Sequence, residues 1–225
     1  MSARTLTALA SVIILGCVAA CASNAPPQET HDGLVLQPDT KFGEVYVRPG
    51  ASLAGYDQVG LMPCQVAFRK NWLRDQNRSS MDLSSRVTQQ DVDRIKDALG
   101  EHCDKYFREA LAAPPAYDIV EELDNGESVL VLRPSIINLD IKAPENMSAG
   151  RTRTYTTSSG EMTLLLEVLD GTTGEILVRV VDRRRGMDSG RMEWTNGVTN
   201  RADADRTLRR WAEQLRTGLD TANGT

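Results

Sequence analysis

The strongest constraint on the fold is a pair of apolar segments, residues 162–169 and 176–181, that flank a short polar turn. The turn, residues 170–175, has the sequence DGTTGE. Its two glycines can adopt a positive φ, and the side chain of Asp170 or Thr173 can bond to amides of the turn. This pattern predicts an antiparallel β-hairpin. It lacks the Gly-Lys-Ser/Thr ending of a phosphate-binding loop, so we do not interpret it as a nucleotide site.

Two further segments have the three- and four-residue spacing of apolar positions that is typical of amphipathic helices. The first spans residues 88–112, where Thr88 and Asp91 resemble a capping box. The second is expected to begin at Asn200 and to end near residue 220, and its Trp211 is predicted to be buried in the core. The opposite, charged face of this helix is predicted to be solvated and carries Arg209, Arg210, Glu213 and Arg216.

Shorter alternating segments predict the remaining strands. Residues 56–68 form the first, and Pro63 within it cannot donate a ladder hydrogen bond, so this strand is expected to be bent, bulged or at an edge. Residues 117–123 and 128–142 flank a turn at residues 124–126 and are predicted to form a second hairpin. Together the segments predict an α+β fold, a mixed and mostly antiparallel β-sheet of about four to six strands with two long helices packed against it.

The N-terminus carries the clearest functional signal. Arg4, an apolar run and small residues before two cysteines are typical of a bacterial lipoprotein signal peptide, which is cleaved directly before the cysteine that takes the lipid. Cys21 follows the small residues VAA and precedes a polar segment, so it is the favoured lipidation site. Cys17, which follows ILG, is the alternative. The apolar run is too short for a membrane-spanning helix and lacks a flanking cluster of charges.

We therefore expect a signal peptide over residues 1–20, a flexible tether over residues 21–41 and a single periplasmic α+β domain over residues 42–225. The tether is expected because its composition is rich in Pro, Gln, Asn and Asp. Neither Ala22 nor Val18 is the aspartate with which enteric bacteria retain lipoproteins at the inner membrane. These features predict a palmitate-bearing lipoprotein anchored in the outer membrane, with its domain facing the periplasm.

Cys64 and Cys103 are the two cysteines of the predicted domain. Export to an oxidising compartment permits a disulfide between them. The alternative is a pair of buried free thiols that pack as small apolar residues. The sequence contains no Cys-x-x-Cys spacing, which argues against a catalytic cysteine pair.

The formal net charge of −5 argues against general nucleic-acid binding, because such binding depends on a basic surface. Two short basic stretches, residues 151–153 and 183–185, are interpreted as solvated charges at strand ends or loops. Contact with an acidic glycan, lipopolysaccharide or phospholipid headgroup is their alternative role. His102 lies beside the apolar stripe of the first helix and is interpreted as a packing residue at the core boundary.

No nucleophile, base or metal-ligand set appears in a recognisable pattern, so we assign no catalytic, cofactor-binding or metal-binding residue. An envelope hydrolase would need two convergent carboxylates. The acids that could serve lie at predicted strand ends and turns, and they are Glu121, Glu122, Asp140 and Asp182.

The strongest hairpin also carries a family resemblance. Residues 164–177 (LLLEVLDGTTGEIL), residues 181–184 (VDRR) and residues 211–215 (WAEQL), with GYDQV at residues 55–59, resemble the bacterial lipoprotein family known as domain of unknown function 3313. The order of these parts is more specific than any one of them. The resemblance implies a location in the envelope, and the family has no established catalytic or ligand residues to transfer.

The leading hypothesis is a non-enzymatic binding or adaptor module. It would contact the membrane through its N-terminal lipid and would bind another envelope component, for which a protein is the simplest choice. The alternatives are an envelope hydrolase acting on glycan or lipid, and a carrier that holds a small molecule or lipid between the helices and the sheet.

Overall fold

The structure is a computed structural model that describes residues 25–56, 58–78, 86–121, 123, 128–141, 155–156, 160–185, 193–194 and 197–224. Side chains are described for all of these except residues 155–156, 193–194 and 197–200. The two predicted lipidation sites, Cys21 and Cys17, lie outside the described residues.

The centre of the fold is a mixed sheet of eight strands in the order β1-β2-β9-β8-β6-β3-β5, with β4 also paired to β6. It exceeds the predicted four to six strands because its outer strands have only three or four residues, too few for a clear alternating pattern. The strands are β1 (Val35–Gln37), β2 (Glu44–Val47), β3 (Gln58–Leu61), β4 (Gln65–Phe68), β5 (Asp118–Val120), β6 (Val129–Asp140), β8 (Glu161–Asp170) and β9 (Ile176–Arg185). A separate two-stranded sheet pairs β7 (Tyr155–Thr156) with β10 (Glu193–Trp194).

The hairpin of β8 and β9 is confirmed as the antiparallel core of this sheet. Its turn is held by Asp170, whose carboxylate accepts hydrogen bonds from the amides of Thr172 and Thr173 at 2.9 and 2.7 Å. Gly174 has a φ of 70°, which a glycine adopts without steric cost. The local turn chemistry therefore produces the hairpin that the sequence predicts.

The predicted second hairpin, from residue 117 to residue 142, is wrong. Strand β3 lies between β5 and β6 and runs parallel to both. Gly60 of β3 leaves room for Leu123, since a Cβ at this glycine would lie 2.2 Å from the Leu123 Cδ2 atom. A turn signal is local, whereas the partner of β5 is decided by packing with a segment about sixty residues earlier.

Pro63 interrupts the first predicted strand as expected. Strands β3 and β4 lie on either side of it, and both pair parallel with β6. Between them the Met62 amide still donates to the Leu132 carbonyl at 2.9 Å. The break therefore separates two strands without removing this part of the chain from the sheet.

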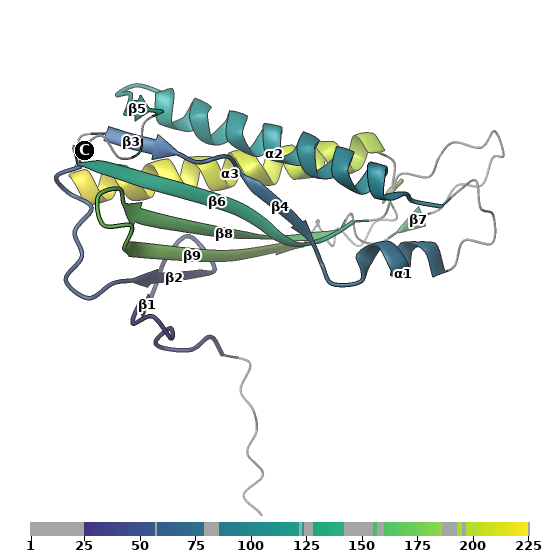
Figure 1. The fold of residues 1–225 in the computed structure, drawn as a ribbon, viewed down its shortest axis with the longest axis horizontal. Coiled ribbons are helices and arrows are strands. Elements are labelled where there is room, and N and C mark those ends of the chain that lie inside the picture. The colour runs from purple at the N-terminus through teal and green to yellow at the C-terminus, as the bar shows by residue number, and fades with distance from the viewer. Residues whose placement is uncertain are drawn as a thin grey trace, which may run out of the picture.

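Two long helices pack on one face of the sheet, and a short third helix was not predicted (Figure 1). Helix α2 (Gln89–Ala112) begins at the predicted capping box, in which Thr88 and Asp91 bond to each other's backbone amides. Helix α3 spans Gly197–Asn223, and helix α1 spans Trp72–Arg78. The largest fully buried side chains of the helix-covered core are Trp211, Phe107, Leu111, Leu132, Ile136, Leu164, Leu166 and Leu208.

The charged face of α3 is not simply solvated, contrary to prediction. The Arg216 side chain is only 11% exposed and donates to the carbonyls of Ala113 and Pro115, just beyond the end of α2. Arg209 lies with its guanidinium 4.6 Å from the centre of the Tyr106 ring. Both arginines therefore join α3 to α2, a role that helical periodicity does not reveal.

The predicted tether is too long at its C-terminal end. Leu34 is fully buried, and β1 pairs antiparallel with β2. Within this segment the Leu36 amide donates to the Gln28 carbonyl at 2.9 Å. Residues 28–37 are thus part of the folded sheet edge, because β1 has a backbone partner on each side.

In the part of the chain that the structure describes, none of the helices has the length and apolar character needed to cross a bilayer.

Candidate binding surface

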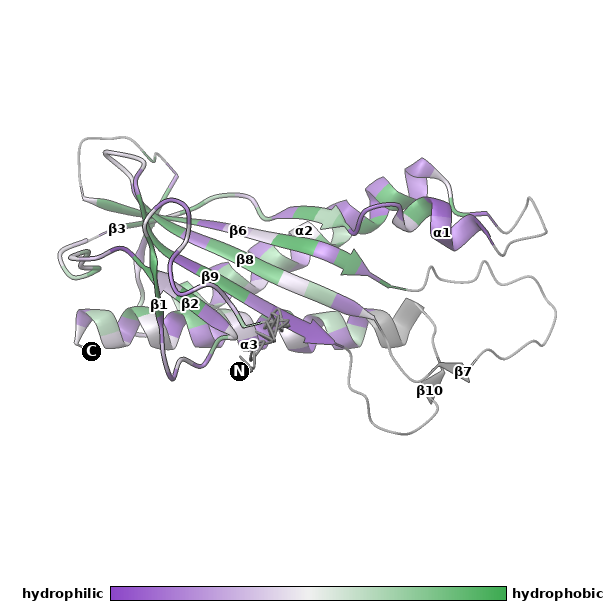
Figure 2. Cartoon of the chain, turned by 90° about the horizontal axis from the view of Figure 1, so that it is seen from below, coloured by the Kyte–Doolittle hydropathy of each residue, from purple (hydrophilic) through white to green (hydrophobic). Residues whose placement is uncertain are grey.

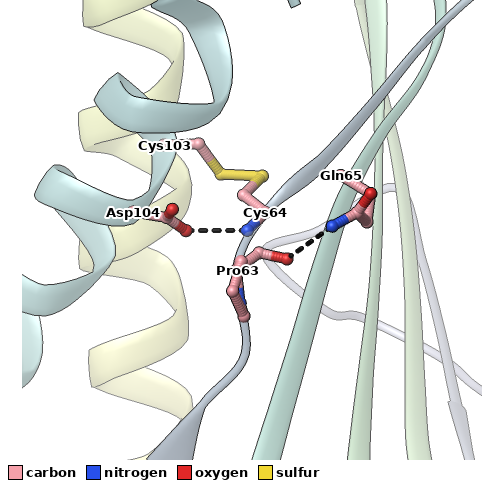
Figure 3. Close-up of a disulfide and its surroundings, with 5 residues drawn as sticks. All are labelled: Pro63, Cys64, Gln65, Cys103 and Asp104. Atoms are coloured by element: carbon pink, nitrogen blue, oxygen red, sulfur yellow. Dashed lines mark hydrogen bonds between the residues drawn. A yellow bond between two sulfur atoms is a disulfide. The ribbon is translucent and has the colours of Figure 1, made fainter. Parts of the chain in front are cut away.

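The two cysteines of the domain form a disulfide that joins the start of β4 to helix α2 (Figure 3). The Cα atoms of Cys64 and Cys103 are 6.2 Å apart. The next residue of α2, Asp104, accepts a hydrogen bond from the Cys64 amide at 2.7 Å, and burial raises the pKa of its carboxyl group. The bridge therefore holds the chain after Pro63 against the helix, and it leaves no free thiol at either cysteine.

The acids considered for hydrolysis are engaged by different arginines. Glu121 is exposed and lies 3.5 Å from the Arg108 guanidinium, and Asp140 lies 2.7 Å from Arg69. Asp182 is paired with a third arginine, as described next, and Glu122 lies outside the described residues. The structure therefore does not assemble the predicted candidates into a pair of catalytic carboxylates.

Asp182 is the centre of a buried polar cluster between β9 and α3. Its side chain is nearly inaccessible, and its Oδ2 atom accepts hydrogen bonds from the Trp211 indole nitrogen at 2.7 Å and from Arg184 at 2.8 Å. Its Oδ1 atom accepts from the Gly43 amide at 3.1 Å. A buried carboxylate with three donors is satisfied, so this acid fixes α3 and the start of β2 to β9.

The opposite side of the central strands offers a different surface. Side chains alternate along a strand, so every second residue of β6, β8 and β9 points away from the helix-covered core. Figure 2 shows bands of hydrophobic and hydrophilic residues along these strands, and the end of β9 is strongly hydrophilic. We call this surface the open face, and it comprises Arg133, Ser135, Ile137, Thr163, Leu165, Glu167, Arg179, Val181 and Arg183.

Aliphatic side chains lie at the middle of the open face. Leu165 and Val181 are directly opposite each other on β8 and β9, and Ile137 is opposite Thr163 on the neighbouring strand pair. All three aliphatic residues are partly exposed, and none belongs to the core cluster beneath the helices. The centre of the open face is therefore a small apolar patch that the described helices do not cover.

One side of this patch is bordered by a charged row. Arg133, Glu167 and Arg179 occupy opposite positions on β6, β8 and β9, with closest ion-pair distances of 2.6 and 2.9 Å. Arg179 also makes two hydrogen bonds to Asp32, at 2.8 and 2.9 Å. These bonds hold the pKa of Asp32 well below its usual range, and they raise that of Arg179. The row contains two arginines and two acids, so its formal charges balance.

The other side of the patch is bordered by arginines at the end of β9. Arg183 and Arg185 both bind Glu161, with shortest distances of 2.6 and 3.0 Å, and this pairing lowers the pKa of Glu161. Arg184 points to the other face and binds Asp182. The basic stretch of residues 183–185 thus lies at a strand end, as predicted, while residues 151–153 lie outside the described residues.

Histidines contribute little to either surface. His102 Nδ1 lies 2.7 Å from the Asp205 carboxylate, so it joins α2 to α3 at the boundary of the core, as predicted. His31 is almost fully exposed near Asp32. Within the described ranges, no group of three or more His, Cys, Asp and Glu side chains is arranged to hold a metal ion.

Sequence reasoning missed the open face because its residues look like ordinary strand residues. The alternation in β6, β8 and β9 predicts which residues share a face, but the charged row also requires Asp32, about 150 residues before its partner Arg179. The one available signal was the opposite placement of Glu167 and Arg179 in the predicted hairpin. Its register could have suggested a cross-strand ion pair.

Comparison with solved structures finds distant likeness. The PelC dodecamer from Paraburkholderia phytofirmans is 12% identical, covers 76% of this chain and 94% of its own, and aligns with a TM-score of 0.38. A protein from Helicobacter pylori described as a neuraminyllactose-binding hemagglutinin homolog is 9% identical, covers 77% and 90%, and has a TM-score of 0.35. These scores are too low to carry an argument about this chain.

Comparison with protein sequences is more informative about kinship than about activity. None of the curated proteins matches the chain. Residues 30–215 match the family described as "Protein of unknown function (DUF3313)", and the match includes both strands of the confirmed hairpin and most of α3. This match covers most of the sequence, and it agrees with the resemblance seen in the residues themselves. The chain therefore belongs to the DUF3313 family.

Proposed function

We propose that this chain is a lipid-anchored protein of the bacterial outer membrane that binds another envelope protein through its open face and has no catalytic activity of its own. The observation that carries the proposal is the apolar patch of Ile137, Leu165 and Val181 between two charged borders. An apolar centre with a polar rim is the usual anatomy of a protein–protein interface.

The charged row of the open face favours a protein over an anionic polymer. Arg133 and Arg179 are balanced by Glu167 and Asp32, so this border offers no excess positive charge to a nucleic acid or an acidic glycan. Alternating charges fix the register of a protein partner and exclude wrong partners. The hydrolase alternative receives less support, because Glu121, Asp140 and Asp182 each pair with a separate arginine.

The binding proposal is tested by crosslinking in intact cells followed by capture of the chain. Leu165→Glu places a charge at the centre of the patch, and we expect it to reduce capture of the specific partner at least about tenfold, the effect of losing a central interface residue. Ala98→Glu adds the same charge at an exposed position of α2 and is the matched control. Equal capture by both variants would contradict a role for the open face.

The anchor is tested separately by metabolic labelling with palmitate. We expect label in the wild type and in Cys17→Ala, and none in Cys21→Ala. Label that survives in Cys21→Ala but disappears in Cys17→Ala would move the lipid to the alternative cysteine. A protein that never takes up label would remove the anchor from the proposal while leaving the binding surface to be judged by the capture experiment.

A further inference from the structure

We propose that the β1–β2 edge of the sheet lies against the phospholipid surface, and that helix α2 and strand β5 face away from it. The inference rests on the lipid anchor proposed at Cys21. It goes further by assigning an orientation and a membrane-contacting surface to the domain.

The first step is that residues 28–37 are attached to the sheet. Leu34 is fully buried, and its amide donates to the Thr30 hydroxyl at 3.0 Å. The Asp32 carboxylate makes two hydrogen bonds to Arg179 of β9, and the Asp32 carbonyl accepts from Arg48 at 3.4 Å. Because these contacts hold the segment on both sides of β1, the free part of the tether ends near Gln28.

The second step is the reach of that tether. Gln28 lies seven positions after Cys21, and a fully extended chain of this length spans at most about 25 Å. Pro26 and Pro27 each fix their own φ and favour an extended backbone at the residue before them, which limits how far residues 25–27 can bend. The edge that carries β1 is therefore confined to the vicinity of the lipid headgroups.

The third step is the width of the sheet. Strand β1 forms one edge and β5 the opposite edge, with six inter-strand spacings between them. At roughly 4.8 Å per spacing the two edges are about 29 Å apart. Figure 1 shows the same arrangement, with β1 at the bottom and with β5 and α2 at the top. A tether of about 25 Å is shorter than this width, so the domain cannot invert to stand on its β5 edge with the β1 edge farthest from the membrane.

The composition of the edge agrees with this placement. Val35 of β1 is 38% exposed. Among the residues that the structure describes, it is the one large hydrophobic side chain that is exposed. Nearby charges are mixed, with Lys41 and Arg48 offsetting acids such as Asp39 and Glu44. We therefore expect the tether, and not attraction to anionic lipids, to determine the orientation.

The experiment uses the full-length lipidated protein in phospholipid vesicles that contain a spin-labelled headgroup quencher. Val35→Cys on β1 and Ala98→Cys on α2 each receive a fluorophore, since the native pair Cys64 and Cys103 is disulfide-bonded and both new positions are exposed. We expect several-fold stronger quenching at position 35, unchanged when phosphatidylglycerol is added. A flexible Gly/Ser insertion between Ala25 and Pro26 should remove most of the difference.

Three other results would each overturn the orientation, and they differ in what they imply for the proposed anchor. Equal quenching at the two positions, in protein whose lipid at Cys21 is verified by mass spectrometry, would overturn the orientation and leave the proposed anchor intact. A lipid found on Cys17 would lengthen the reach to about 40 Å, more than the sheet width, and would remove the basis of the inference. An unlipidated native protein would overturn the anchor and the orientation together.

Discussion

The two faces of the central sheet are built from the same three strands but are used differently. On the helix-covered face, β6, β8 and β9 contribute a continuous apolar core against α2 and α3, and the acid Asp182 is satisfied by three donors. On the open face, apolar and charged residues are mixed, and the ion pairs of Glu167 remain partly exposed. The covered face therefore holds most of the buried apolar side chains, while the open face is the surface that the proposed partner would contact.

The two arginine-paired acids make the contrast concrete. Asp182 is 3% exposed and receives a Trp211 hydrogen bond, so losing a donor would leave a buried charge poorly solvated. Glu167 is bound by Arg133 and Arg179 at the surface, where water can replace a lost partner. The ion pairs of Asp182 and Glu167 thus contribute unequally to the free energy of unfolding, because Asp182 is more deeply buried.

The largest expected effect comes from breaking the covered face at Trp211. Trp211→Ala would leave a large cavity and remove one donor from Asp182, so we expect a loss of about 5 kcal/mol in the free energy of unfolding. Trp211→Phe keeps much of the packing and should cost clearly less. Urea denaturation followed by circular dichroism measures both, and equal costs would show that the lost indole hydrogen bond, which both variants lack, outweighs the lost packing.

Removal of the disulfide should have the next largest effect. Cys64 and Cys103 are 39 positions apart, and the chain-entropy model gives a stabilisation of about 4 kcal/mol for a loop of this length. We expect the double variant Cys64→Ala/Cys103→Ala to denature at lower urea, and reduction to lower the wild-type midpoint similarly. The double variant is its own control, because reductant should not affect it. A wild type whose midpoint survives verified reduction would contradict the prediction.

Alkaline pH should weaken the attachment of the hairpin turn. The Tyr56 hydroxyl donates to Asp170 at 2.7 Å, and burial together with this carboxylate raises the pKa of Tyr56 to about 12. The folded state then binds the proton more tightly than the unfolded state, so this contribution is complete below the ordinary tyrosine pKa of about 10 and disappears as the pH rises to about 12.

Tyr56→Phe tests this attachment directly. It should cost about 1 kcal/mol at neutral pH, the net value of one hydrogen bond, and should flatten the decline in stability above pH 10 or so. Unfolding free energies measured across this pH range provide the comparison. A variant that declines as steeply as the wild type would show that Tyr56 is not the group responsible.

The smallest effect on stability is expected on the open face. Arg133→Ala removes a partly exposed ion pair with Glu167 and should change the free energy of unfolding by less than about 1 kcal/mol. The same variant should nevertheless weaken capture of the envelope partner. A large loss of stability would show that the open face stabilises the fold as the covered face does, which would contradict the difference inferred between the two faces.

The sequence by itself determined the local elements. The hairpin turn at Asp170, the capping box at Thr88, the break at Pro63 and the burial of Trp211 all follow from chemistry within a few residues or from one helical period. It also determined which residues share a face of β8 and β9, because side chains alternate along a strand.

Only the tertiary structure decided which distant segments meet. Strand β5 pairs with β3 in place of β6, residues 28–37 join the sheet edge, and Asp182 finds its donor in α3. Each of these contacts depends on burial and packing between segments far apart in the chain. Short strands have too few residues for a sequence pattern that predicts their partners. The hairpin could be predicted from its turn, whereas the candidate binding surface and its orientation could be derived only from the assembled sheet.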